Sequence, residues 1–361
     1  MRKKKSNLPK TIVILLLTVM LIYTTALILQ LRLPLQLPVA LPPISQQDEI
    51  KNLQGKTIIL DPGHGYGNTN VFENYDEHVR MLLLAHKIKP LLEEAGATVH
   101  MTRPTEADVL LPARAAITNK LALELIRQHK RDDLISVVQY EDEEKIQLAQ
   151  ELQRDIVEID RLIDMLTRII YDPDTYGRIY MNFPFDRNHQ REIHPDLQRV
   201  FEFQDDERIR RTFLMISLHS NAPPNPIDTS INGADAFFIS NNLRVSRSYF
   251  GNYTSVNYSA YFAERIIENI DALGIRRGNA FGTNLFVLRE TNVPAVLVEN
   301  GFHTNPQDRA KLLCDDFLER LAVVYLETIT GYFANIVVVP NYRPAMPRIL
   351  ERVFDMFSNS H

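Results

Sequence analysis

Residues Thr57 to Gly65 read TIILDPGHG, an apolar, β-branched run that Asp-Pro-Gly interrupts just before a histidine. An uninterrupted apolar run is typical of a strand buried on both faces of a sheet, and the Pro-Gly pair predicts a turn at its end. In an open α/β sheet the functional crevice lies beyond the carboxyl ends of the parallel strands. We therefore predict an α/β fold, a mostly parallel sheet flanked by helices, with His64 at its functional edge.

Two later stretches repeat this arrangement. FLMISLHSN ends an apolar run at His219, and PAVLVENG ends another at Glu299. Three polar side chains at three strand ends indicate a metal site, and catalytic zinc needs three protein ligands and an open position for water. Because Cys314 is the only cysteine, the ligands must be His and carboxylate. The carboxylate ligand is Glu77, in the first turn of a predicted helix, or Glu73, whereas Glu299 can serve as general base or acid.

The rest of the hydrophobic pattern alternates between helical and strand periods. Helices are expected at residues 76–95, 114–126, 195–211, 256–273 and 306–333, and strands at 97–103, 213–218, 234–240, 285–288 and 294–298. Residues 171–195 are rich in aromatic and turn residues, which predicts an ordered loop.

Residues 120–211 read as a helical insertion into this fold. Their main feature is an apolar stripe at alternating steps of three and four residues, formed by Ala149, Leu152, Ile156, Ile159, Ile163, Leu166 and Ile170. We expect this stripe to pack on the main domain or on a neighbouring helix. The alternative is that the helix at 142–171 binds a regulatory protein or inhibits the enzyme itself.

The N-terminus predicts a membrane anchor. Residues 1–10 form a basic tail, and residues 11–32 form an apolar segment of about the ~20 residues that span a bilayer as a helix. A basic flank places the tail in the cytoplasm and the catalytic domain outside the cytoplasmic membrane. A cleaved signal peptide is the alternative, but its apolar core would be only ~7 to 15 residues long. The proline-rich residues 33–54 predict a spacer, and residues 336–361 a C-terminal tail.

Composition sets broad limits on function. The chain has 361 residues, 45% of them hydrophobic and 24% charged, which is ordinary for a globular protein. Its net charge of -5, with no basic face beyond the N-terminus, argues against a nucleic-acid partner.

Six blocks resemble the zinc-dependent N-acetylmuramoyl-L-alanine amidases, which cut peptidoglycan. They are LDPGHG at 60–65, EHVRMLLLAHKIKPLLEEAG from Glu77, VHMTR at 99–103, LPARAAITN at 111–119, ISLHSNA at 216–222 and PAVLVENGFHTNPQD at 294–308. The resemblance covers residues 55–119 and 212–333, in the family's order. It implies a catalytic domain at 55–335, interrupted by the insertion.

By this resemblance the metal ligands are His64, Glu77 and His219, the catalytic residue is Glu299, and the cofactor is Zn²⁺. The spacing within the helix favours Glu77 over Glu73. Asn221 and Arg289 match positions that line the substrate groove. The implied reaction is hydrolysis of the amide between the lactyl group of N-acetylmuramic acid and L-alanine of the stem peptide, in cell wall remodelling or cell separation.

Two alternatives remain open from the sequence. A zinc peptidase or deacetylase could use the same ligands on another envelope substrate. An inactive scaffold could bind peptidoglycan or a partner through the inserted helix. The segment after His64 also departs from the family, because residues 66–75 are rich in Asn and aromatic residues where glycines are common.

Overall fold

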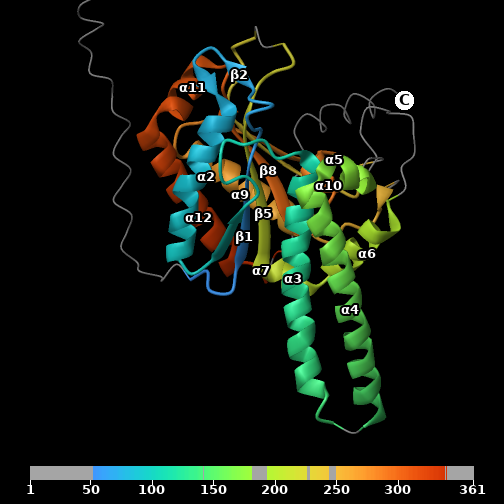
Figure 1. The fold of residues 1–361 in the computed structure, drawn as a ribbon. Helices are drawn as coiled ribbons and strands as arrows, with labels where there is room; N and C mark the ends of the chain where they lie inside the picture. Colours follow the sequence, from blue (N-terminus) through green and yellow to red (C-terminus); the bar gives the residue numbers. More distant parts are fainter. Residues whose placement is uncertain are drawn as a thin grey trace, which may run out of the picture. The chain divides into compact units, whose positions relative to one another are not determined.

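The computed structural model describes residues 52–140, 142–180, 193–225, 228–243, 249–337 and 339 (Figure 1). The chain divides into two units, Met1–Ile50 and Lys51–His361, and every described residue belongs to the second. Within this unit a six-stranded sheet lies between two layers of helices, which confirms the predicted α/β fold.

The sheet has the strand order β4-β1-β5-β8-β6-β7. Its strands are β4 (Thr98–Met101), β1 (Thr57–Pro62), β5 (Phe213–Asn221), β8 (Ala295–Phe302), β6 (Ala234–Phe238) and β7 (Arg277–Gly282). The first four run parallel to one another, whereas β6 is antiparallel to β8, and β7 follows the direction of β6. The carboxyl ends of β1, β5 and β8 therefore share one edge, and the start of β6 meets them there. A second, two-stranded sheet pairs β2 (Val71–Phe72) with β3 (Tyr75–Asp76).

The two faces of the sheet bury separate apolar clusters. In β1, Ile58 and Leu60 pack into one cluster and Ile59 into the other, as alternation along a strand requires. The first cluster includes side chains of α2 (Glu77–Glu94), α9 (Val256–Asp271) and α12 (Asp315–Ala334). The second includes side chains of α3 (Leu111–Val137), α4 (Glu143–Tyr171), α6 (Pro195–Gln204) and α10 (Phe286–Arg289). Because both faces are covered, the central strands are apolar throughout, which is the pattern seen in the sequence.

Helices α3 and α4 form a long antiparallel hairpin whose distal part extends away from the sheet (Figure 1). The predicted stripe faces the neighbouring helix: Leu152, Ile156, Ile159 and Leu166 are buried. Arg127 and Lys130 of α3 form ion pairs with Asp160 and Asp155 of α4. The prediction that the stripe packs on a neighbouring helix is confirmed.

After the hairpin the chain returns to the sheet through short helices. These are α5 (Pro173–Tyr176), the 3₁₀ helix η1 (Gly177–Tyr180), α6 and α7 (Glu207–Thr212). The predicted helix at 306–333 is two helices, α11 (Pro306–Leu313) and α12, because Cys314 between them has extended backbone angles. The predicted strand at 285–288 is wrong: four apolar residues fit one helical turn as well as a strand, and α10 forms there.

The prediction of a single-pass protein of the cytoplasmic membrane is contradicted. Across the described ranges, no helix combines the length and the apolar character needed to cross a bilayer. The segment 11–32, on which that prediction was based, lies outside the described residues, as do the spacer up to Lys51 and residues 340–361 of the tail.

Candidate functional site

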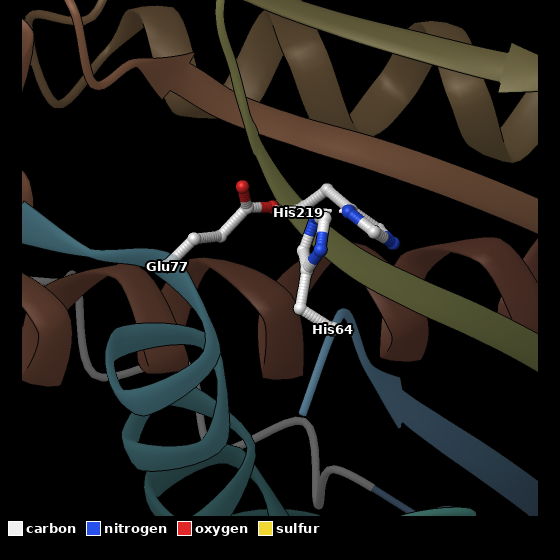
Figure 2. Close-up of side chains that lie close together, drawn as sticks. All are labelled: His64, Glu77 and His219. Carbon is white, nitrogen blue, oxygen red and sulfur yellow. Dashed lines mark hydrogen bonds and ion pairs between the residues drawn. The ribbon is translucent and has the colours of Figure 1, made fainter. Parts of the chain in front are cut away.

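His64, Glu77 and His219 come together at the shared strand edge (Figure 2). His64 follows β1 by two residues, His219 lies near the end of β5, and Glu77 opens α2. One ligand atom from each residue lies within 4.8 Å of the others. His219 pairs in register with Glu299 of the neighbouring strand β8. The convergence predicted from the three strand ends is therefore present.

Glu77 is the centre of this cluster. Its Oε1 lies 3.2 Å from His64 Nε2 and 3.0 Å from His219 Nδ1, and it accepts a 2.9 Å hydrogen bond from the backbone N–H of Ser220. Asn70 Nδ2 donates to the other carboxylate oxygen. Burial opposes ionisation, but the hydrogen bonds and charges of the two histidines outweigh it and hold the pKa of Glu77 well below its usual range. An ionised carboxylate is thus available to a cation.

Glu73, the competing carboxylate, lies elsewhere. It is exposed, and its carboxylate pairs with Arg309 on α11. Glu73 lies in the turn of the β2–β3 hairpin, whereas Glu77 follows β3 and belongs to the cluster with the two histidines.

The backbone around His64 adopts a conformation that is costly for a histidine. Its φ of 59° lies in the left-handed region, which favours glycine. The preceding residue, Gly63, must be a glycine for a separate reason, because a Cβ there would overlap the His219 ring. The two histidine rings meet edge to face, with centroids 5.0 Å apart. Close approach of the two strand ends thus depends on Gly63.

Two buried arginines hold this turn in place. Arg103 donates to the carbonyl of Gly63 at 3.0 Å and to that of His78 at 2.8 Å. Arg114, from the first turns of α3, donates to the carbonyl of Pro62 at 2.7 Å and to the carbonyl of His64. Because a guanidinium group carries several fixed donors, each arginine can hydrogen-bond to more than one backbone carbonyl at once.

Arg114 also pairs with Asp61, the last acidic residue before the turn. Its Nη1 lies 2.7 Å from Asp61 Oδ1, and the two side chains are only 4% and 1% exposed. Ser217 donates to the other carboxylate oxygen at 2.6 Å, and Thr102 donates to Oδ1. Although burial acts in the opposite direction, Arg114 and these hydrogen bonds lower the pKa of Asp61. This pair could not be predicted from local sequence, because its members lie 53 positions apart.

Glu299 occupies a less polar environment than Glu77. Its Oε2 is buried and has no hydrogen-bond partner within the described residues. Burial, with the nearby charges of Glu77 and Asp235, raises the pKa of Glu299 well above its usual range. Asp235 reaches it because β6 is antiparallel to β8, so that these two residues stand opposite each other. We did not predict Asp235, since it lies at the start of a strand rather than at its end.

A cavity of about 600 Å³ opens beside the two histidines. Its lining includes His64 and His219, the start of α3, the α5–η1 turn, and residues 285–287. No residue of α4 lines it, so the hairpin helix itself does not cover the histidines.

Asn221 and Arg289, the predicted substrate contacts, are not among the residues that line this cavity. Asn221 Nδ2 lies 3.5 Å from Asp235 Oδ2. Arg289 is buried and pairs with Glu290 at 2.7 Å.

His303 is a further residue that the sequence analysis missed. It is buried, its Nδ1 lies 4.0 Å from Glu77 Oε2, and its ring stacks on Tyr75 with centroids 5.2 Å apart. Ser220, which donates to Glu77, contacts the same His303 nitrogen. Among the histidines left open by the sequence, His194 caps α6, and His189 lies outside the described residues.

Comparison with solved structures finds amidases of low sequence identity. An N-acetylmuramoyl-L-alanine amidase from Clostridium difficile 630 has a TM-score of 0.45 and 16% identity over 77% of this chain and 97% of its own. The amidase Ami1 from Mycobacterium smegmatis has the same score and identity over 79% and 99%.

Sequence relatives match over short stretches. The probable cell wall amidase LytH of Staphylococcus saprophyticus is 44% identical over 68 residues, which are 18% of this chain and 23% of that protein. An uncharacterised cell wall amidase of Bacillus anthracis is 33% identical over 122 residues, 33% of this chain and 21% of its own. The chain thus spans less than a quarter of the length of either relative.

The family model described as N-acetylmuramoyl-L-alanine amidase matches residues 58–161 and 182–331. These two ranges contain all four residues that meet at the strand edge, and together they make up well over half of the sequence. The protein therefore belongs to the N-acetylmuramoyl-L-alanine amidase family.

Proposed function

We propose that this protein is a peptidoglycan hydrolase, a zinc-dependent N-acetylmuramoyl-L-alanine amidase. It would cleave the amide between the lactyl group of N-acetylmuramic acid and L-alanine of the stem peptide, in cell wall remodelling or cell separation. The catalytic domain would comprise residues 55–335, with the helical insertion at 120–211. The observation that carries the proposal is the meeting of His64, Glu77 and His219 beside Glu299 at one strand edge.

The donor set suits zinc. Two imidazole nitrogens and one carboxylate oxygen are ligands that zinc takes in catalytic sites, where a fourth position stays open. Bonds of about 2.0–2.1 Å in a tetrahedron put ligand atoms about 3.3 Å apart. The 3.2 Å and 3.0 Å separations around Glu77 Oε1 are close to this value. In this proposal His64, Glu77 and His219 hold the ion.

Zinc, when bound, would polarise the scissile carbonyl and lower the pKa of a water molecule. Glu299 would take the proton of that water at a carboxylate oxygen and deliver it to the leaving amine of L-alanine. Its partnerless Oε2 supports this role, and burial raises its pKa in the direction that strengthens a carboxylate as a base. Arg103 and Arg114 would keep His64 in place by fastening its turn.

Mass spectrometry of purified muropeptides incubated with the protein tests this proposal. We expect release of intact stem peptides from intact sugar, loss of this activity with a chelator, and recovery with zinc. Glu299→Gln should abolish release while zinc content stays near one ion per chain. Glu77→Gln should lose both, and the matched control Glu73→Gln should keep both, because Glu73 faces Arg309 instead.

The products also separate the alternatives. A deacetylase would remove only an acetyl group, and a peptidase would leave a shortened stem on the sugar. An inactive scaffold would bind peptidoglycan and yield no product at all. Any of these results would contradict the amidase assignment.

A regulatory protein that binds through the 142–171 helix is a separate proposal. Its support is a group of exposed apolar side chains at the distal end of the hairpin, namely Ile146 on this helix, Ile135 on α3, and Val138 and Tyr140 after α3. Ile135→Glu with Ile146→Glu should leave hydrolysis by the purified protein unchanged but lower it in cells. Equal hydrolysis in cells would contradict a partner at this surface.

A further inference from the structure

One wall of the cavity beside the histidines comes from a stretch that the family model leaves out. The model matches up to residue 161 and resumes at residue 182. Pro173, Asp174 and Gly177 lie within that gap and line the cavity together with His64 and His219. We refer to residues 172–180 as the inserted wall. The matched family model does not include these residues.

The inserted wall is firmly attached to the rest of the domain. Asp172 caps α5 by accepting a 3.1 Å hydrogen bond from the backbone N–H of Thr175. Gly177 packs so closely on the first turn of α3 that an added Cβ would lie 2.8 Å from Pro112 Cβ. Pro112 itself lines the cavity. The position of the wall is therefore set by a contact that admits no side chain.

Tyr180 fixes the far end of the wall. It is fully buried, and Asn119 Nδ2 on α3 donates to its hydroxyl at 3.0 Å. Its ring meets Phe286 edge to face, with centroids 6.0 Å apart. Phe286 itself lines the cavity. The wall thus contacts α3 and α10, and both helices contribute residues to the cavity lining.

The chemistry of the lining favours peptide over sugar. The apolar part of the cavity lining, which is the larger part, comes mainly from residues 109–112 and 285–287, and its polar part includes Asn68, Asp108 and Arg114 besides the histidines. Sugar hydroxyls lose hydrogen bonds to water in such surroundings, whereas the methyl and methylene groups of short peptide residues gain from burial. Asp174 is the wall's one charged residue in the lining, and it is exposed at the rim.

We propose that the inserted wall is a specificity element that binds the peptide part of the substrate, on the side of the amide away from the sugar. This rests on the proposed function. The apolar inner surface would contact the first residues of the stem. Asp174 would lie against the stem as well, and its negative charge favours a stem in which a side chain carries a free amino group.

Binding measurements test this inference without relying on turnover. The parent protein is Glu299→Gln loaded with zinc, and calorimetry gives its Kd for a free stem tripeptide and for N-acetylmuramic acid. Gly177→Ala should raise the Kd for the peptide threefold or more and leave the sugar unchanged, because the added methyl displaces the wall from Pro112. Gly331→Ala on α12, where a Cβ meets nothing within 4 Å, is the matched control and should change neither Kd.

A second variant keeps the test valid should Gly177→Ala fail to fold. Asp174→Lys alters only an exposed side chain, and it should weaken binding of the amine-bearing tripeptide threefold or more. The same substitution should weaken binding less when the side-chain amine of the peptide is acetylated. Three results would each overturn the inference. Asp174→Lys could have the same Kd as its parent for both peptides, the variants could change the Kd for the sugar alone, or the parent could bind no peptide. Peptide binding without muropeptide cleavage by the wild-type protein would instead contradict only the proposed function.

Discussion

Arg114→Met should be one of the most damaging single substitutions in the domain, although Arg114 does not belong to the His64–Glu77–His219 cluster. The change removes one partner of an ion pair whose side chains are 4% and 1% exposed, and leaves Asp61 charged and buried. Breaking such a pair costs about 3–5 kcal/mol, because one charge stays uncompensated. The carbonyls of Pro62 and His64 lose a donor as well.

The assay is urea denaturation of the metal-free protein, followed by zinc titration of whatever remains folded. Arg161→Met is the matched control: Arg161 also pairs with carboxylates, those of Glu158 and Asp196, but its side chain is 50% exposed. An exposed pair contributes about 0–1 kcal/mol. We also expect zinc affinity to fall about 10- to 100-fold in Arg114→Met, as when residues that orient ligands are lost.

A double variant separates charge from packing. Asp61→Asn with Arg114→Met should be less destabilised than the sum of the two single variants, because the second change removes the stranded charge. A loss of unfolding free energy in Arg114→Met no larger than that in Arg161→Met, or simple addition of the two single effects, would show that Asp61 and Arg114 are not coupled as an ion pair.

Substitutions at Gly63, Glu299 and Leu162 test three other features of the structure. Gly63→Ala should abolish zinc binding in a protein that still shows native circular dichroism, because a Cβ would overlap the His219 ring; stoichiometric zinc by mass spectrometry would argue against it. Burial and two nearby carboxylates raise the pKa of Glu299, so its protonated form stabilises the metal-free fold, and that stability is lost as pH rises through the raised pKa. Glu299→Gln should therefore have a higher free energy of unfolding than the wild type at pH 8 and the same free energy of unfolding near pH 4. An equal difference at both pH values in urea denaturation would be inconsistent with this account. In the hairpin, Leu162→Ala should lower the free energy of unfolding by about 2–5 kcal/mol, because Leu162 is fully buried. Val157→Ala on the same helix should lower it by less than about 0.5 kcal/mol, because Val157 is 62% exposed. Similar thermal melts of the two variants would contradict the packing.

The parts of the fold that were predictable are those with a strong local signal. Strands β1, β5 and β8 are apolar on both faces, and α4 has a clear apolar stripe, so their sequences identify them. Helix α3 was expected only at 114–126, because its second half is mostly charged and polar. His64, His219 and Glu299 could be singled out because each follows such an apolar run, although β5 continues to Asn221 and β8 to Phe302. Strand β7, RGNAFG, is polar and glycine-rich and lies at the sheet edge, and nothing in its pattern marks a strand.

The remaining parts of the site depend on contacts distant in sequence. Glu73 and Glu77 differ by four positions, and only the turn of the β2–β3 hairpin decides which one meets the histidines. Asp235 approaches Glu299 because β6 reverses direction, and no periodicity reports strand direction. Arg114 and Asp61 become partners only when α3 packs against β1, which local sequence does not encode.

The α3–α4 hairpin bears on how this domain can change its length. Two antiparallel helices that bury their stripes against each other can gain or lose whole turns at the distal end, provided both change together. Each such step shifts the tip by about 5.4 Å and leaves the base, where Arg114 and the start of the inserted wall lie, in the same place. The hairpin is therefore a natural place for grafting: a fluorescent domain or an affinity tag joined at residues 138–142 would be carried at a distance from the histidines. Such a fusion would report on where the protein goes, and because it would stand beside the exposed Ile135, Val138, Tyr140 and Ile146, it would also obstruct any partner that binds there.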